Sequence, residues 1–293
     1  MLCEYFLVIL QNVLKIPITL FMENKKVLFI SQEITPYLPE TEISQIGRHL
    51  PQGIQEKGKE IRTFMPRYGL INERRNQLHE VIRLSGMNLI IDDTDHPLII
   101  KVASIQSARM QVYFIDNEEY FQRKHLLKDD DENYFEDNDE RAIFFARGVL
   151  ETVKKLRWSP DIIHCHGWIT SMVPLLIKRV YNEEPTFANS KVIYSVYNDD
   201  FKDTLDSEIR TKIALEGIEK NDTELLSKPD FINVSKFAIE HSDAAIKGSE
   251  KINEEVEKYL AKVEKPYLEY HNMDSYIDAY SSFYDKILDE ENE

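Results

Sequence analysis

Several features are scarce or absent in this sequence, and each absence narrows what the protein can be. The chain contains only two cysteines, Cys3 and Cys165. That number excludes a disulfide framework and indicates a reducing compartment, which we predict to be the cytoplasm. Basic residues are also few, with 36 Lys and Arg against 52 Asp and Glu, which gives a formal net charge of −16. Such a surface repels nucleic acid and anionic membranes, and we expect neither as a partner.

Linkers, repeats and cofactor fingerprints are missing as well. The sequence has no Gly/Ser-rich linker and no internal repeat, which predicts one folded domain. No Gly-x-Gly-x-x-Gly follows the first apolar run, so the dinucleotide fingerprint is absent and we predict no cofactor.

The first segment, residues 1–24, lacks the features of a targeting signal although it is rich in apolar residues. Glu4, Lys15 and Pro17 interrupt it, and it has neither a basic start nor a small-residue cleavage site. These interruptions also make a membrane span a weak interpretation. We expect that the start codon has been assigned too far upstream and that the native protein begins at Met22. The alternative is that the residues before Met22 form a short membrane-associated segment. The folded domain is then predicted to cover residues 25–293.

The rest of the sequence alternates short apolar runs with segments of helical periodicity. Residues 26–31 are typical of a buried parallel strand, residues 43–57 place apolar side chains at helical spacing, and residues 61–65 form a second strand. This order predicts an α/β fold with a Rossmann-like, doubly wound parallel sheet. Residues 80–115 contain four further strand candidates, including 80–84, which predict a β-hairpin or meander in or at the edge of that sheet.

Turns and helices complete the expected architecture. Residues 92–97 are predicted to form the turn of that hairpin. Asn138 or Asp139 is expected to cap a helix with acids in its first turn and lysines in its last. A final amphipathic helix at 274–288 is expected to pack back on the sheet and cover apolar surface.

The most informative stretch is 161–170, where an apolar pair leads into a turn that carries His164, His166 and Trp168 and then into a helix. A short apolar run followed by a turn and a helix is the strand–loop–helix unit of an α/β protein. Ligands of open parallel sheets collect at the carboxyl ends of such strands, so these side chains are expected at a crevice. The alternative, which these residues alone favour, is that the two histidines and the tryptophan only cap and pack the strand end. Two histidines do not make a metal site, and we predict no metal here.

Five collinear segments resemble the opening domain of bacterial glycogen synthases and plant starch synthases. One of them reads Pro-Asp-Ile-Ile-His-Cys-His, and the five lie at residues 26–36, 61–68, 112–121, 137–145 and 160–166. The resemblance implies a retaining glycosyltransferase with two Rossmann-like domains, the GT-B arrangement, which moves glucose from ADP-glucose to the end of an α-1,4-glucan. It covers only the N-terminal, acceptor-side domain. The second domain, which in the family binds most of the nucleotide, has no counterpart in these 293 residues.

The departures from the family pattern fall on its chemistry. Residues 39–42, Pro-Glu-Thr-Glu, stand where the family has Lys-x-Gly-Gly against the donor phosphates. Gly167 and Ile169 replace an acid and a histidine of the strand-end motif, and Tyr197 replaces the histidine that supports the sugar. Since catalysis there needs charges placed at a leaving diphosphate, we predict no catalytic residue and no activity of the chain alone.

Two functions remain open on these grounds. In the first, the chain is a binding or regulatory module in glucan metabolism. In the second, it is half of a split glycosyltransferase that a separate C-terminal GT-B chain completes, against which residues 39–42 argue. A third and weaker hypothesis is a different chemistry at Asp137, His164 and His166, with or without a metal ion, although Asp137 is more typical of a helix start.

The predicted binding site lies at the ends of two neighbouring strands. His164, His166, Trp168, Tyr197 and Asn198 are expected to surround one hollow. Aromatic rings and hydrogen-bonding groups without a cation suit a neutral α-glucan or maltooligosaccharide better than a sugar nucleotide. The alternative is that Tyr197 fills the space that a lost ligand has left.

Overall fold

A single mixed sheet forms the centre of the fold in the computed structural model, which describes residues 24–290. The prediction about Met22 and the segment before it lies outside these residues. Across the described chain the strand order is β10-β9-β8-β7-β1-β2-β6-β5-β3, and β4 pairs with β5. The strands are β1 (Lys26–Ser31), β2 (Glu60–Pro66), β3 (His79–Glu80), β4 (Met87–Ile91), β5 (Thr94–Ile105), β6 (Met110–Asp116), β7 (Ile162–His166), β8 (Lys191–Val196), β9 (Ala244–Lys247) and β10 (Tyr267–Leu268).

The parallel part of the sheet is doubly wound, as predicted. From β1 the chain continues to β2 and β6 on one side, then crosses to β7 on the other side of β1 and continues outward to β8, β9 and β10. All pairings among these seven strands are parallel. The winding direction therefore changes between β1 and β7, whose carboxyl ends meet where Ser31 pairs with His166. Crevices at such a switch point are the usual ligand sites of open α/β sheets.

The predicted hairpin is present at the edge of the sheet, where β5 runs antiparallel to β6, β4 and β3. Its turn is shorter than predicted. Asp92 and Asp93 both have positive φ, 48° and 56°, so two residues close the hairpin and β5 already begins at Thr94. The expected strand at 80–84 is wrong beyond Glu80, because the chain turns there and β3 has only two residues.

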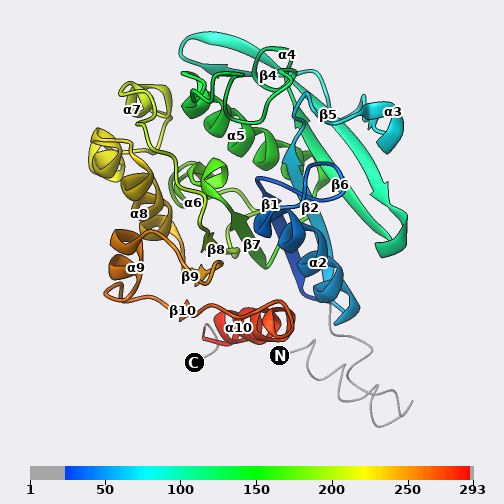
Figure 1. Ribbon diagram of the computed structural model, residues 1–293, viewed down its shortest axis with the longest axis vertical. Helices are drawn as coiled ribbons and strands as arrows, with labels where there is room; N and C mark the ends of the chain where they lie inside the picture. The colour runs from blue at the N-terminus through cyan, green and yellow to red at the C-terminus, as the bar shows by residue number, and fades with distance from the viewer. Residues whose placement is uncertain (1–23, 291–293) are drawn as a thin grey trace, which may run out of the picture.

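Helices cover both faces of the sheet (Figure 1). The α-helices are α2 (Glu42–Glu56), α3 (Glu73–Asn76), α4 (Glu118–Phe121), α5 (Asn138–Leu156), α6 (Met172–Arg179), α7 (Ile209–Lys212), α8 (Phe231–His241), α9 (Glu254–Leu260) and α10 (Tyr276–Asp289), with 3₁₀ segments η2 (Gln106–Ala108), η3 (Trp168–Thr170) and η4 (Lys220–Ser227). Side chains of β1 alternate between two cores, as strand geometry requires. Leu28 and Ile30 belong to the core that includes buried residues of α5, α6 and α8, whereas Val27 and Phe29 belong to the core that includes those of α2 and α10.

The C-terminal helix α10 packs on the sheet beside α2, which confirms the prediction for the final amphipathic helix. It buries Tyr276, Tyr280, Phe283, Tyr284 and Ile287. Burial of five large side chains at about 1.5–3 kcal/mol each makes this contact worth on the order of 10 kcal/mol before the entropy of ordering is subtracted. The close approach to α2 occurs at Gly53, where a Cβ atom would lie only 2.6 Å from the side chain of Ile277.

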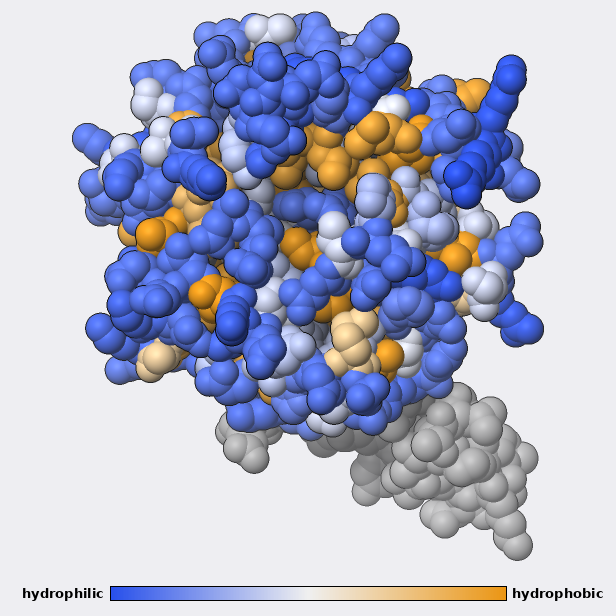
Figure 2. Space-filling model, in the orientation of Figure 1, coloured by the Kyte–Doolittle hydropathy of each residue, from blue (hydrophilic) through white to orange (hydrophobic). Residues whose placement is uncertain are grey.

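The surface fits the acidic composition. The face in Figure 2 is mainly hydrophilic, with smaller groups of hydrophobic residues between the polar ones. Within residues 24–290, no helix is both long and apolar enough to cross a bilayer.

Candidate functional site

The two histidines of β7 lie in the core and not at an open crevice. His164 and His166 are each fully buried, on the face of the sheet that α10 covers. Their intervening neighbour Cys165, a free thiol, faces the other core. Alternation along the strand thus places both rings on one face, and their centroids are 3.8 Å apart.

Hydrogen bonds tie these rings to tyrosine and serine side chains. Nδ1 of His164 lies 2.6 Å from the hydroxyl of Tyr284 on α10, and its Nε2 lies 2.7 Å from Oγ of Ser195 on β8. Nδ1 of His166 lies 2.7 Å from the hydroxyl of Tyr197. Nε2 of His166 is buried and has no partner among the described residues.

Burial decides the charge of this cluster. It holds the pKa of His164 well below its usual value of 6.5, with a further contribution from the neighbouring His166. It also lowers the pKa of His166 to about 3. Both imidazoles are therefore neutral near pH 7, and neither offers positive charge to a diphosphate.

The aromatic pair expected around one hollow is divided between the two faces of the sheet. Tyr197 is 1% exposed, belongs to the core under α10, and packs its ring against Gly248, where a Cβ atom would lie 2.6 Å from the ring. Trp168 is also 1% exposed but belongs to the opposite core, with its ring centroid 4.9 Å from that of Phe201. Between β7 and Trp168, Gly167 adopts a φ of 84°, which turns the chain away from the strand.

The structure therefore brings together His164, His166 and Tyr197, but not around an open hollow. Asn198 is exposed at the end of β8, and its backbone N–H donates to Oγ of Ser249. The expectation that all five side chains stand at one crevice is wrong in geometry, because strand alternation and Gly167 separate them. Their role in sugar binding stays a prediction, and in this structure Tyr284 on α10 and Tyr197 occupy hydrogen-bonding positions of the two histidines.

The groups that do occupy the switch point were missed by the sequence argument. Gln32 follows β1, its backbone N–H donates to the carbonyl of His166, and its Oε1 accepts from the N–H of Ile169. Glu33 is 8% exposed and accepts a hydrogen bond from the hydroxyl of Thr41 at 2.7 Å. The sequence feature that could have identified them as site residues is their position directly after a buried strand.

Asp199 adds a second carboxyl group at this edge. It accepts a 3.1 Å hydrogen bond from the backbone N–H of Trp168. Burial raises the pKa of Asp199 to about 7, and the charges of Glu33 and Asp200 act in the same direction, against hydrogen bonds from the backbone N–H groups of Trp168 and of Asp199 itself. A carboxyl group with a pKa near 7 changes its charge near neutrality.

The N-terminus of α2 is closed by its own side chains. Thr41 is the N-cap, and a reciprocal capping box joins it to Ser44. Glu42 in the first turn accepts a hydrogen bond from the Ser249 hydroxyl. A free helix N-terminus attracts phosphate, whereas here the capping box takes up the N–H groups of Thr41 and Ser44, and the first turn carries the carboxylate of Glu42.

The hypothesis of metal-assisted chemistry has no support in the geometry. Asp137 occupies the N-cap position of α5 and pairs with Arg123, one oxygen lying 2.7 Å from Nη1. The sequence predicted Asn138 or Asp139 as the N-cap of this helix, and that prediction was wrong by one or two residues. In the part of the chain that is described, no group of three His, Cys, Asp or Glu residues could hold a metal ion.

Comparison with known proteins identifies the family. Residues 26–265 match the family model of the starch synthase catalytic domain. This chain belongs to that family. Glycogen synthase of Chlorobium limicola is 36% identical over 221 residues, which are 75% of this chain and 45% of the relative. Glycogen synthase of Chlorobium phaeovibrioides is 35% identical over 234 residues, 80% of this chain and 47% of the relative. The chain thus spans about half the length of the curated relatives it matches.

A solved structure shows the same fold. The catalytic domain of starch synthase IV from Arabidopsis thaliana, bound to ADP and acarbose, superposes with a TM-score of 0.68 at 17% identity. The match covers 87% of this chain and 53% of that one. It confirms the expected GT-B type of α/β domain for this family member.

Proposed function

We propose that this starch-synthase-like domain transfers no glucose by itself and acts in the cytoplasm as a binding or regulatory module in glucan metabolism. The observation that carries the proposal is the closed N-terminus of α2. At this position the family resemblance implies a lysine and two glycines near the donor phosphates. This chain instead presents Pro39, a self-capped helix and the carboxylate of Glu42.

The electrostatics of the neighbouring groups support the same conclusion. Glu33 and Asp199 lie at the switch point, and the histidines behind them are neutral. Loss of one preorganised donor in an active site costs about 10²–10³ in rate. Here the lysine of the family pattern is replaced by Pro39, the sugar-supporting histidine by Tyr197, and a glycine by the acidic Glu42. A leaving ADP would meet repulsion where the transition state needs stabilisation.

The ligand class follows from the family and from this charge distribution. An α-glucan carries no charge, so acidic groups cost it little, whereas a diphosphate is repelled. Retention of the fold with a changed phosphate site therefore supports a neutral glucan or maltooligosaccharide as the ligand.

A transferase assay tests the central claim. Purified chain is incubated with labelled ADP-glucose and glycogen, with the full-length Chlorobium limicola glycogen synthase as positive control. We expect incorporation at background level for this chain. Turnover that survives repurification and is lost in a folded His166→Gln variant would overturn the proposal.

The split-transferase alternative rests on the span of the chain, about half that of its curated relatives. It is tested by adding the separately produced C-terminal half of the Chlorobium limicola enzyme to the same assay. Transfer that requires both polypeptides would establish the alternative, and its absence over a range of concentrations supports the binding module.

A further inference from the structure

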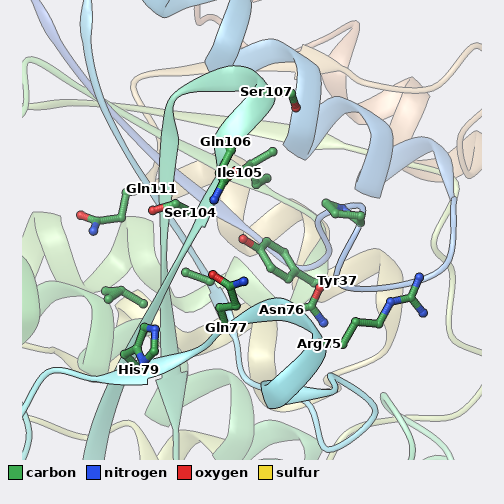
Figure 3. A pocket seen from close by; sticks show the side chains of 13 residues that line it. Tyr37, Arg75, Asn76, Gln77, His79, Ser104, Ile105, Gln106, Ser107 and Gln111 are labelled. Atoms are coloured by element: carbon green, nitrogen blue, oxygen red, sulfur yellow. The ribbon is translucent and has the colours of Figure 1, made fainter.

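A pocket of about 580 Å³ lies outside the antiparallel edge of the sheet, remote in sequence from the β7 and β8 strand ends. It is bounded by the loop after β1 at Pro36 and Tyr37, by the end of α3 and by the last residues of β5 (Figure 3). Its volume falls within the range of small-molecule sites in proteins. No residue of the predicted strand-end site lines it.

The polar groups of the pocket are unusual for so acidic a chain. Of the described residues that line it, none is Asp or Glu, although the net charge of the chain is −16. Amide and hydroxyl side chains dominate, including those of Gln77, Gln106, Gln111 and Ser104. Each amide offers both donors and acceptors, which is what the hydroxyl groups of a sugar require.

Tyr37 gives the pocket a fixed, unfilled hydrogen-bonding group. Its side chain is 7% exposed and its ring packs edge-on against Phe114, with centroids 4.9 Å apart. The hydroxyl has no hydrogen-bond partner among residues 24–290. Figure 3 shows this oxygen directed into the group of pocket side chains. A buried hydroxyl without a partner is costly, and an incoming ligand hydroxyl would satisfy it.

The backbone around the pocket is held in place before any ligand arrives. Gln77 is the left-handed C-cap of α3, with φ of 53°, and its backbone N–H donates to the carbonyl of Arg74 at 3.3 Å, which ends the helix beside the pocket. Behind the pocket, Arg48 donates to Ser107 at 3.1 Å and to Gln52 at 2.8 Å. This arginine is therefore engaged and does not line the pocket, whose basic lining residues are Arg75 and His79.

We propose that this pocket is a second saccharide site, which holds a neutral α-glucan segment against Tyr37 and the amides of Gln77 and Gln106. The assignment to α-glucan rests on the function proposed above, whereas the preference for a neutral polyol rests on the pocket alone. A site at this position anchors a glucan chain to the domain without using the strand-end residues.

Calorimetric titration of the whole chain with maltohexaose tests the proposal. Tyr37→Phe should weaken binding about three- to tenfold, the range of one neutral hydrogen bond, without loss of thermal stability, since the hydroxyl has no protein partner to lose. Gln77→Ala combined with Gln106→Ala should weaken it by about tenfold or more. One matched control is Tyr276→Phe, which removes another buried hydroxyl without a partner among the described residues. The other is Gln55→Ala, which removes an exposed amide on α2. Neither control should change the affinity for maltohexaose.

Several results would overturn the site. These are no binding of maltohexaose at about 10 mM, well above the range expected for a specific pocket, or equal losses in the pocket variants and the controls. Preference for cellohexaose over maltohexaose would overturn the α-glucan assignment. Displacement by inorganic phosphate, abolished in Arg75→Gln, would show an anion site instead. The transferase assay is independent of these outcomes, so glucose transfer by a chain that also binds here would refute the proposed function and leave the pocket standing.

Discussion

Tyr284 and His164 are 120 residues apart in the chain and share a buried hydrogen bond of 2.6 Å between the tyrosine hydroxyl and Nδ1. The bond joins α10 to the central strand β7. Neither partner is exposed, so water cannot replace it when it is broken. A histidine that the sequence predicted to line a sugar-binding hollow therefore holds the C-terminal helix in this chain.

Removal of this bond should weaken the docking of α10. Tyr284→Phe leaves a buried nitrogen of His164 without a partner, and we expect the free energy of unfolding to fall by about 1–3 kcal/mol. For a domain of this size the midpoint of thermal unfolding should fall by about 2–4 °C for each kcal/mol. Tyr276→Phe on the same helix is the control and should be close to neutral, since its hydroxyl has no partner within the described chain. Equal effects of the two variants would contradict the structural role of the bond.

His166 should make the protein sensitive to acid. Its pKa is about 3 in the folded state against an ordinary value of 6.5, so between these values the unfolded chain binds more protons. This contribution to stability is complete above about pH 6.5 and is lost as the pH falls toward 3, at up to about 1.4 kcal/mol per pH unit. His166→Gln lacks the effect. We expect denaturant unfolding to show wild type losing stability relative to the variant from pH 6 to pH 4. A constant difference across that range would refute a neutral buried His166.

Asp199 should act in the opposite direction. Its folded pKa is raised to about 7 from 3.8, so the folded state binds more protons in that window. This contribution to stability is complete below about pH 3.8 and is lost as the pH rises toward 7. Asp199→Asn keeps an acceptor for the N–H of Trp168 without the titration. Wild type should therefore lose stability relative to the variant from pH 4 to pH 7. NMR titration of the Asp199 carboxyl carbon provides a direct measurement, and a midpoint near 4 would exclude the raised pKa.

Restoration of the family's acid at position 167 should destabilise this chain. Gly167 has φ of 84°, and a Cβ atom there would lie 3.0 Å from Gln32. We expect Gly167→Asp to lower the free energy of unfolding by about 1–3 kcal/mol and to restore no glucose transfer. Gly58→Ala is the control for the backbone alone, because Gly58 also has positive φ but a Cβ atom added there would meet nothing within 4 Å. If Gly167→Asp costs no more than Gly58→Ala, the contact with Gln32 is not a constraint.

Much of the fold could be predicted from local patterns. Apolar runs gave β1, β2 and β7, periodicity gave α2 and α10, and the alternation of strands and helices gave the doubly wound sheet. Errors arose where tertiary pairing sets the ends of elements. Asp92 and Asp93 close the hairpin in two residues because their backbones are left-handed, and apolar spacing does not encode that conformation.

The candidate site was less predictable. The order of residues along β7 and β8 correctly indicated that His164, His166 and Tyr197 are neighbours. It did not indicate which face of the sheet they occupy or that α10 lies over them. The surroundings of Tyr37 could not be predicted for the same reason. Its ring packs against Phe114, which is 77 positions away in the sequence.

The sequence by itself determined the family, the α/β class and the replacement of the lysine, the acid and the histidine of the family pattern. These properties follow from residue type and order, which folding does not alter. Tertiary structure alone decided that the histidines are neutral and buried beneath α10, that Thr41 and Ser44 cap the N-terminus of α2, and that a pocket without acids forms beside Tyr37. The physical reason is that burial, pKa and enclosed space depend on which distant segments pack against a residue, and contacts between distant segments exist only once the sheet is assembled.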